Sequence, residues 1–243
     1  MANIVLIGSG NVATQLGKVL YNAGHSIKQV FSRNIENAKL LSIEIHSKPI
    51  DNLNEIVVDA DFYIISIADD AINIIVSFFE NIKGIVIHTS GSVGIEVFKD
   101  SIKNYGIIYP LQTFSKSLFL NFEKIPFCIE ANSESNLLKI KELTSNFSNN
   151  IFEISSNQRK YLHLAAIFVN NFANSLYVCA SDILENQNIP FDLLKPLILE
   201  TASKVQFRNP IETQTGPAKR NDFKIIEKHL HLLENNERYK NLY

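Results

Sequence analysis

Two glycines and an alanine follow a short, mostly apolar run at the start of the chain. Residues 2–7 suit a buried strand, and they lead directly into Gly8-Ser9-Gly10-Asn11-Val12-Ala13 and a helix-like stretch that extends to Leu20. Gly8 permits a tight strand-to-helix turn, Gly10 lets the backbone approach a pyrophosphate, and the small Ala13 lets the helix pack closely on the sheet. Because the strand and the helix that this motif requires are both present, the pattern predicts a dinucleotide-binding turn rather than an ordinary glycine turn.

The end of the second expected strand indicates which dinucleotide binds. In dinucleotide-binding folds, an acidic residue about 20 positions after the glycines holds the ribose 2′-hydroxyl. The expected strand 27–31 ends instead in Ser32-Arg33-Asn34, and a hydroxyl beside a guanidinium suits a 2′-phosphate. We therefore expect NADP(H) rather than NAD, with Ser32 and Arg33 at the 2′-phosphate. The alternative is that Arg33 is a solvated surface residue.

The first half of the chain alternates short apolar runs with helical patterns, as a parallel sheet with crossover helices does. The expected strands are 2–7, 27–31, 61–67, 84–88, 106–109, 125–131 and 151–155. Ligands of open α/β sheets bind outside the carboxyl ends of the strands. The candidate site residues at such ends are Ile67 and Ala68 beside the cofactor, His88 and Ser90 as hydrogen-bonding groups beside the nicotinamide, and Gln112 as a substrate contact.

Some of these positions also have ordinary structural roles. Ser90-Gly91-Ser92 has the composition of a simple turn, which is the alternative to a role for Ser90 in binding substrate. Asp69 or Asp70 could cap a helix that follows strand 61–67.

After about residue 156 the pattern changes from short strands to long helical periods, which cover 157–186, 192–208 and 222–234. The sequence therefore predicts an α/β fold class with two domains. A Rossmann NAD(P)-binding domain spans 1–155, and an all-α domain for substrate binding and dimerisation spans 156–243.

The first long helix carries a stripe of polar residues. At the 3.6-residue helical period, one narrow face collects Lys160, His163, Asn170, Asn174 and Ser181. The rest of the circumference is mostly apolar or small, which predicts a helix buried on several sides. We expect the stripe to line the active cleft; the alternative is a solvent edge or a structural polar network.

Composition and charge limit the possible partners and compartments. The chain has 243 residues, 46% of them hydrophobic, and a net charge of −2 without a basic cluster, which argues against nucleic acid. The apolar window 161–180 contains His163 and three asparagines, which are expensive in hydrocarbon, so we do not expect it to enter a membrane. Cys128 and Cys179 imply no disulfide framework, and no secretory signal is evident, so a reducing, cytoplasmic location is expected.

Five segments together resemble a known family over essentially the whole chain. They are GSGNVA at 8–13, HTSGS at 88–92, YPLQTFS at 109–115, YLHLAAIFVNNFANSLY at 161–177 and TGPAKRND at 215–222. The sequence resembles the family of oxidoreductases that join a Rossmann-like domain to a DUF2520 domain. More distantly it is similar to ketopantoate reductases, pyrroline-5-carboxylate reductases and β-hydroxyacid dehydrogenases, which place an NADP-binding Rossmann domain before a helical domain. The YPLQ segment resembles the HP-containing loop of prephenate dehydrogenases.

One departure from these relatives bears on catalysis. Ketopantoate reductases and β-hydroxyacid dehydrogenases use a Lys and, four residues later, an Asn on the first long helix of the second domain. Aligned by the helix start, these positions fall on His163 and Ile167, with a further polar position on Asn171, so the Lys-Asn pair is absent. Histidine side chains titrate near neutral pH, which makes His163 a candidate proton donor. Lys160 is the alternative donor, and a structural role is open for both.

The resemblance implies an NADP-dependent oxidoreductase acting on a small carbonyl, hydroxy or imine compound with an acidic group. In the turn 215–222, Arg220 or Lys219 could bind a carboxylate, while Asn221 or Asp222 could cap a helix. The opposing hypothesis is a non-catalytic NADP(H)-binding sensor or regulatory module, which the missing Lys-Asn pair favours.

The helical half also predicts an oligomer. Two further helices cannot easily cover a long helix that is apolar over most of its circumference, because small domains bury a low fraction of their surface. We expect a homodimer, the commonest soluble assembly, with Phe168, Phe172, Leu176 and Leu197 at or near the interface.

Overall fold

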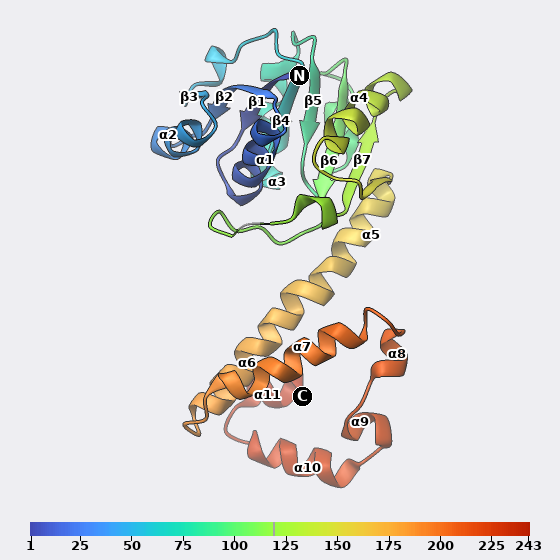
Figure 1. Ribbon diagram of the computed structural model, residues 1–243. Coiled ribbons are helices and arrows are strands. Elements are labelled where there is room, and N and C mark those ends of the chain that lie inside the picture. Colours follow the sequence, from blue (N-terminus) through green and yellow to red (C-terminus); the bar gives the residue numbers. More distant parts are fainter. Residues whose placement is uncertain (119) are drawn as a thin grey trace. The chain divides into compact units, whose positions relative to one another are not determined.

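The computed structural model describes residues 1–118 and 120–243, which form two compact units, Met1–Asn170 and Asn171–Tyr243. The first unit is a Rossmann-like α/β fold and the second is helical (Figure 1). The sequence predicts a domain boundary after residue 155, whereas the two units divide after Asn170, inside the long helical segment that follows. The early turns of that segment belong to the first unit because they bury Ser156 and Arg159.

The first unit is built on one sheet with the strand order β3-β2-β1-β4-β5-β6-β7-β8. The strands are β1 (Asn3–Ile7), β2 (Ser26–Phe31), β3 (Lys48–Ile50), β4 (Phe62–Ile65), β5 (Ile85–His88), β6 (Tyr105–Pro110), β7 (Phe127–Ala131) and β8 (Ile151–Glu153). Neighbouring strands from β3 to β6 are parallel, so their carboxyl ends meet at one edge. The β3-to-β6 part has the strand order of dinucleotide-binding folds.

Two features of the sheet were not expected from the sequence. The edge strand β3 is only three residues long and contains Pro49, which cannot donate to a ladder, so it carried no strand signal. Strand β7 is antiparallel to β6, with Ile108 opposite Ile129, because an apolar run does not encode the direction in which it pairs. Strand β8 returns to parallel pairing with β7.

Side chains of the strands alternate between two cores, one on each face of the sheet. In β1, Ile4 and Leu6 join one core and Val5 and Ile7 join the other. The first core is covered by α1 (Asn11–Asn22), α2 (Ile35–Glu44) and α4 (Glu134–Ser145), of which α1 and α4 cross the sheet in Figure 1. The second is covered by α3 (Asp69–Ile75) and the 3₁₀ turns η2 (Val76–Phe79) and η3 (Ile95–Phe98).

The long helical segment contains an irregular turn. It comprises α5 (Ser156–Ile167), a π-helical turn (Phe168–Phe172) and α6 (Ala173–Glu185), and it starts with a capping box between Ser155 and Gln158. A π turn accommodates an extra residue, so residues after it are rotated relative to an uninterrupted α-helix. The prediction of one polar stripe from Lys160 to Ser181 is therefore wrong, because it assumed a constant 3.6-residue period.

The second unit is helical throughout. Beyond α6 it contains the 3₁₀ turn η6 (Phe191–Leu194), α7 (Lys195–Lys204), α8 (Pro210–Thr213), α9 (Pro217–Arg220), α10 (Phe223–Leu232) and α11 (Glu237–Leu242). The expected helical periods 192–208 and 222–234 correspond to α7 and α10, while the short helices α8, α9 and α11 were not expected. Asn221 ends α9 in the left-handed region, and Asp222 caps α10 by accepting a hydrogen bond from the Ile225 amide.

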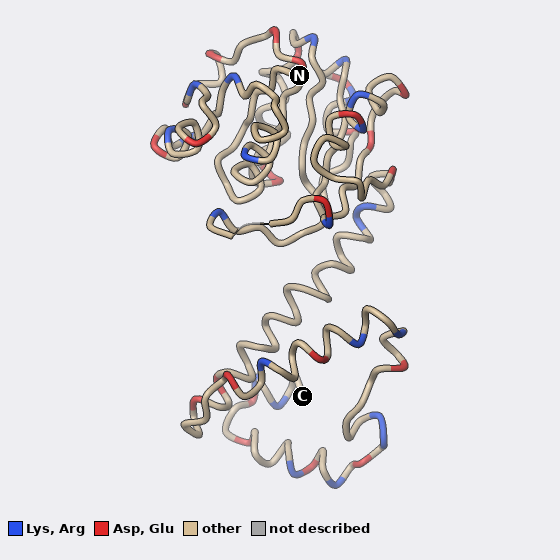
Figure 2. The backbone as a smooth tube through the Cα atoms, in the orientation of Figure 1, with Lys and Arg blue, Asp and Glu red and all other residues tan. Residues whose placement is uncertain are grey.

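Apolar side chains of the long helical segment remain exposed in the single chain. None of the described residues from 171 to 243 is buried, and Phe168 is 59% exposed. The prediction that this helix is buried on several sides is therefore wrong for one chain alone. Residues 161–181 carry no charge (Figure 2), and by length and composition this one helical segment, Ser156–Glu185, would also suffice to cross a membrane.

The exposed apolar surface supports the expected homodimer, which the mass of the protein in solution tests. A helical unit with no buried residue lacks a core of its own, and a second copy would supply the missing apolar contacts. We expect light scattering at micromolar concentration to report about twice the 27.5 kDa chain mass. Replacing Leu176 and Leu197 by Glu should shift the mass towards the monomer. A concentration-independent monomer in the unmodified protein would contradict this prediction.

Candidate functional site

The turn between β1 and α1 has a backbone that only glycine can supply at its first position. Gly8 has φ +124°, and a Cβ there would lie 2.2 Å from the carbonyl oxygen of Ser66. Its amide donates a 2.8 Å hydrogen bond to the carbonyl of Phe31, so the turn is anchored to β2. Gly8 is therefore required both by its dihedral angle and by the close approach of β4.

The first turn of α1 leaves its amides available for an anion. Gly10 is the N-cap and offers no side-chain acceptor, and the first turn has no acidic residue. Asn11 is exposed, Val12 is half-buried, and Ala13 is fully buried against the sheet. A Cβ on Gly10 would meet no atom within 4 Å, so the space beside its backbone is open. Unpaired amides at a helix N-terminus beside open space fit the pyrophosphate of a dinucleotide.

Ser32 and Arg33, the two residues expected at the 2′-phosphate, differ in whether their side chains are exposed to a ligand. Ser9 donates a 2.9 Å hydrogen bond to Ser32 Oγ, and both serines are buried. Ser32 therefore braces the β1–α1 turn from the end of β2 and is not presented to solvent. Arg33 is exposed, and within residues 1–118 and 120–243 it forms no ion pair. Of the two, Arg33 is the group that a 2′-phosphate can reach.

The end of β4 leads into α3 through Ile67, which is half-buried, and Ala68, which is exposed. Ala68 is the N-cap of α3 and makes no side-chain capping bond, so the prediction that Asp69 or Asp70 caps this helix is wrong. The Asp69 carboxylate instead accepts a hydrogen bond from the Ser92 hydroxyl. This bond ties α3 to the loop that follows β5.

His88 and Ser90 lie at the end of β5 but do not face solvent. His88 is 0% exposed, and its Nδ1 accepts a 3.2 Å hydrogen bond from the Ser90 amide. Burial, reinforced by the Arg159 cation, lowers the pKa of His88 to about 4, so the ring is neutral at physiological pH. The Ser90 hydroxyl accepts from the amides of Ser92 and Val93. These contacts favour the structural alternative, in which both residues shape a turn.

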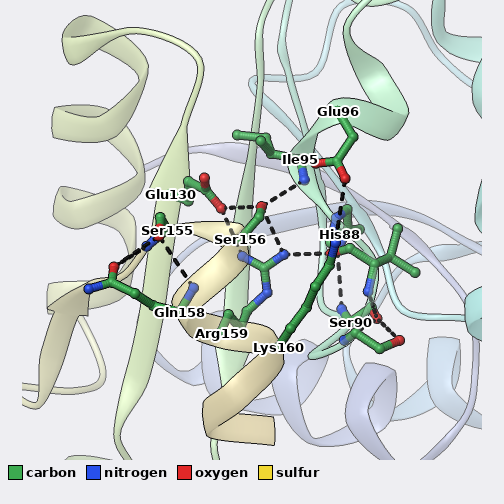
Figure 3. Close-up of polar contacts among 12 residues, drawn as sticks. His88, Ser90, Ile95, Glu96, Glu130, Ser155, Ser156, Gln158, Arg159 and Lys160 are labelled. Carbon is green, nitrogen blue, oxygen red and sulfur yellow. Dashed lines mark hydrogen bonds and ion pairs between the residues drawn. The ribbon is translucent and has the colours of Figure 1, made fainter.

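A buried ion pair fixes the start of α5 against the sheet (Figure 3). Arg159 is 0% exposed, and its Nη1 donates a 2.8 Å hydrogen bond to Glu130 Oε2 on β7. Its Nη2 donates to the carbonyl of Val93, and the Ile95 amide donates to Ser156 Oγ over 2.8 Å. The first turn of α5 is thereby bonded to both β7 and the loop after β5.

The pair with the clearest chemical capacity joins β6 to α5. Tyr109 lies near the carboxyl end of β6, and its hydroxyl lies 2.9 Å from Nδ1 of the half-buried His163. Burial, with a smaller contribution from the Cys128 thiol, raises the pKa of Tyr109 to about 12. Tyr109 therefore stays protonated, and its hydroxyl can donate to Nδ1 when that nitrogen is unprotonated or accept from it when it carries a proton. In both cases the bond occupies Nδ1 and not Nε2.

The other predicted residues are placed as follows. Gln112 is exposed beyond β6, and its side-chain Oε1 accepts a hydrogen bond from the Thr113 backbone amide. Lys160 is half exposed and lies 3.7 Å from Glu96, a weak surface ion pair. Asn170 lies in the π turn at the end of the first unit. Asn171, Asn174 and Arg220 are exposed residues of the second unit.

Three residues at this edge were not identified from the sequence. Tyr109 belongs to the YPLQ segment, for which the sequence predicted no role for the tyrosine. Arg159 lies one turn before His163 on α5. Gly91 packs against the rings of Tyr109 and His163. The available signal was the position of Tyr109 at a strand end and the i, i+4 spacing of Arg159 and His163. Neither signal shows that two elements so far apart in sequence are in contact.

The buried neutral His88 predicts an acid-sensitive stability. Its folded-state pKa lies below the ordinary 6.5, so the unfolded chain takes up the proton first and stability falls as pH drops from 6.5 towards 4. Relative to His88→Gln, the unmodified protein should lose about 2 kcal/mol more free energy of unfolding between about pH 7.5 and about pH 5. Urea denaturation at both pH values measures this difference. Burial also lowers the pKa of His25, but that contribution is common to both proteins. Parallel pH profiles would refute the prediction.

Comparison with known proteins agrees with this architecture. Residues 3–88 match the family described as NADP oxidoreductase coenzyme F420-dependent, and residues 125–243 match the domain of unknown function DUF2520. A "putative NADP oxidoreductase" from Bacteroides fragilis is 40% identical over 100% of this chain and 95% of its own, with a TM-score of 0.94. No curated protein matches the sequence.

More distant structures share the fold. A 1-pyrroline-5-carboxylate reductase from Streptococcus pyogenes is 14% identical, covering 99% of this chain and 97% of its own, with a TM-score of 0.69. An imine reductase from Myxococcus stipitatus in complex with NADP⁺ is also 14% identical, covering 99% and 89%, with a TM-score of 0.68. The dinucleotide-binding turn, the strand order and the full-length match at 40% identity lead to one conclusion: the chain belongs to the family of Rossmann-type NADP oxidoreductases that carry a DUF2520 domain.

Proposed function

We propose that the protein is an NADPH-dependent reductase or dehydrogenase of a small carbonyl, hydroxy or imine compound that carries an acidic group. The observation that carries this proposal is the hydrogen bond between Tyr109 and His163. It occupies Nδ1 of His163 and so leaves Nε2 as the nitrogen that can give a proton to a substrate, at the edge of the sheet where the dinucleotide-binding turn lies. A proton donor at that edge is what carbonyl or imine reduction requires of the protein itself.

The residues that would hold NADPH follow from the geometry of the β1–α1 turn. The amides at the start of α1 would bind the pyrophosphate, the open space beside Gly10 would admit it, and Arg33 would bind the 2′-phosphate. Ile67 and Ala68 would lie beside the cofactor at the end of β4. When bound, NADPH supplies the hydride for the reduction.

His163 would hold and deliver the proton. In the imidazolium form of the ring, Nε2 donates a hydrogen bond to the substrate oxygen or nitrogen and transfers its proton there as negative charge or basicity develops. The neutral imidazole that remains keeps its proton on Nδ1, bonded to the Tyr109 oxygen. The Tyr109 hydroxyl remains on Nδ1 throughout and orients the ring. Because burial keeps the pKa of Tyr109 near 12, the phenol does not compete by ionising.

The substrate class rests on the fold relatives and on one cation. The pyrroline-5-carboxylate reductase and the imine reductase act, by their names, on imines, and the first of these substrates is a carboxylate. Arg220, exposed at the end of α9, is the proposed carboxylate-binding residue because its guanidinium can bind a carboxylate bidentately. The proposal therefore extends to imines and 2-keto acids as the first compounds to test.

A second candidate function is a nucleotide-bound sensor that performs no hydride transfer. The position of the relatives' Lys is occupied by His163 and that of their Asn by Ile167, so the familiar catalytic pair is absent. A panel of 2-keto acids, imines and prephenate-like compounds, assayed for NADPH turnover, separates the two functions. Tight NADPH binding without turnover of any of them would favour the sensor.

The cofactor preference gives the first prediction for this site. Replacing Arg33 with Ala should weaken NADPH binding by about 1.5–3 kcal/mol, the range for hydrogen bonds to charged groups, and leave NADH binding nearly unchanged. Calorimetry with both cofactors measures the difference. Arg208→Ala is the matched control, because Arg208 is also exposed and, within the described chain, forms no ion pair. Equal losses for NADPH and NADH would remove Arg33 from the 2′-phosphate site.

The proposed proton donor gives the second prediction for this site. His163→Ala should lower turnover by about 10²–10⁴-fold, the usual range for general acid–base catalysis, while NADPH affinity stays close to that of the unmodified protein. His231→Ala, which removes an exposed imidazole elsewhere, should leave turnover unchanged. A His163→Ala variant that keeps full turnover would exclude this residue as the donor. A collapsed melting temperature would mark it as structural.

A further inference from the structure

Gly91 is a glycine for which the backbone gives no reason. Of all the described residues, the glycines with positive φ are Gly8, Gly24 and Gly216, so Gly91 adopts an angle open to any residue. The space around Gly91, in contrast, leaves no room for a side chain. A Cβ at Gly91 would lie 2.5 Å from His163 Nδ1, 2.7 Å from His163 Cγ and 2.9 Å from Tyr109 Cε2. The two rings, and not the backbone, exclude a side chain here.

Displacing either ring would cost free energy, because both are held by their surroundings. Tyr109 is 8% exposed and belongs to a small core with Ile107 and Cys128. The Cγ of His163 is bonded directly to its Cβ, so moving it requires a different rotamer or a displaced helix. The helix is held by Arg159, one turn earlier, through its ion pair with Glu130.

The loop that carries Gly91 is also held on both sides. Before it, the Ser90 amide donates to the buried His88 ring over 3.2 Å. After it, Val93 accepts from Arg159 and its amide donates to Ser90 Oγ over 3.0 Å. The Ser92 hydroxyl donates to Asp69 on α3. With anchors at these positions, the backbone of Gly91 cannot recoil from an added Cβ.

We propose that Gly91 is a positioning residue: its backbone, which carries no side chain, packs against the Tyr109–His163 pair, sets the position of the two rings and covers the hydrogen bond between them. The inference rests on the proposed role of His163 as proton donor. Water excluded from the Nδ1 side cannot replace the Tyr109 hydroxyl, so Nε2 stays the nitrogen that faces the substrate. The loop after β5 thereby acts on the reaction without touching the substrate.

Gly91→Ala tests the inference against a matched variant in the same loop. Gly94 has φ −80° and ψ 160°, and the three atoms nearest to a Cβ there all belong to the carboxylate of Glu96, the flexible end of an exposed side chain. We expect Gly91→Ala to lower kcat about 100-fold, as a displaced catalytic group does, with an unchanged Kd for NADPH. Gly94→Ala should stay within about twofold of the unmodified enzyme.

A spectroscopic measurement reads the position of the ring without any substrate. The ¹⁵N resonance of His163 Nδ1 in Gly91→Ala should move towards its value in Tyr109→Phe, which lacks the hydroxyl that bonds to it. An unmoved resonance together with a normal kcat would overturn the inference. If His163→Ala retained full turnover, the proposed function would fail, whereas this resonance would still report whether Gly91 positions the pair.

A double-mutant cycle keeps the inference testable if Gly91→Ala is poorly folded. Removing the imidazole frees the space that the new Cβ needs, so the drop in melting temperature caused by Gly91→Ala should shrink by about half or more in the His163→Ala background. Contact with Tyr109 remains in both backgrounds and accounts for the rest. An equal drop in both backgrounds would show that His163 is not what excludes a side chain at position 91.

Discussion

The ion pair of the buried Arg159 constrains the first unit more than any other single contact. A guanidinium that is 0% exposed must be paired, and removing one partner of such a pair costs about 3–5 kcal/mol. Its partners are Glu130 on β7 and the carbonyl of Val93 in the loop after β5. Strand, loop and helix α5 must therefore be in place together. His163, four residues after Arg159, is positioned by the same requirement.

The direction of the strands explains why this constraint reaches the site. Because β1, β4, β5 and β6 are parallel neighbours, the turn at Gly8, the end of β4, the loop after β5 and Tyr109 all lie at one edge of the sheet. Strand β7 runs the other way and places Glu130 opposite Ile107 on β6. The reversal supplies the carboxylate that Arg159 needs close to the strand that carries Tyr109.

What could be predicted from the sequence is what depends on neighbouring residues. The turn at Gly8, the parallel strands other than β3 and the start of α5 follow from glycine geometry, apolar periodicity and a capping serine. The direction of β7, the π turn at 168–172 and the burial of Arg159 depend on contacts between distant segments, and no local pattern encodes them. Gly8 and Gly91 illustrate the difference. The first is required by its own dihedral angle, whereas the second is required by a ring 72 positions away, as its contact with His163 shows.

A histidine acting where the distant relatives use a lysine, as proposed for His163, makes a different demand on the surrounding protein. An ammonium group has three equivalent protons and needs only to be aimed, whereas an imidazole ring has two nitrogens, either of which could face the substrate. A partner on Nδ1 is therefore required before Nε2 becomes a defined donor, and Tyr109 is that partner. The partner must itself stay protonated, which its raised pKa ensures. The hydrogen bond between Tyr109 and His163 meets this demand, and it is the reason for proposing an enzyme rather than a sensor.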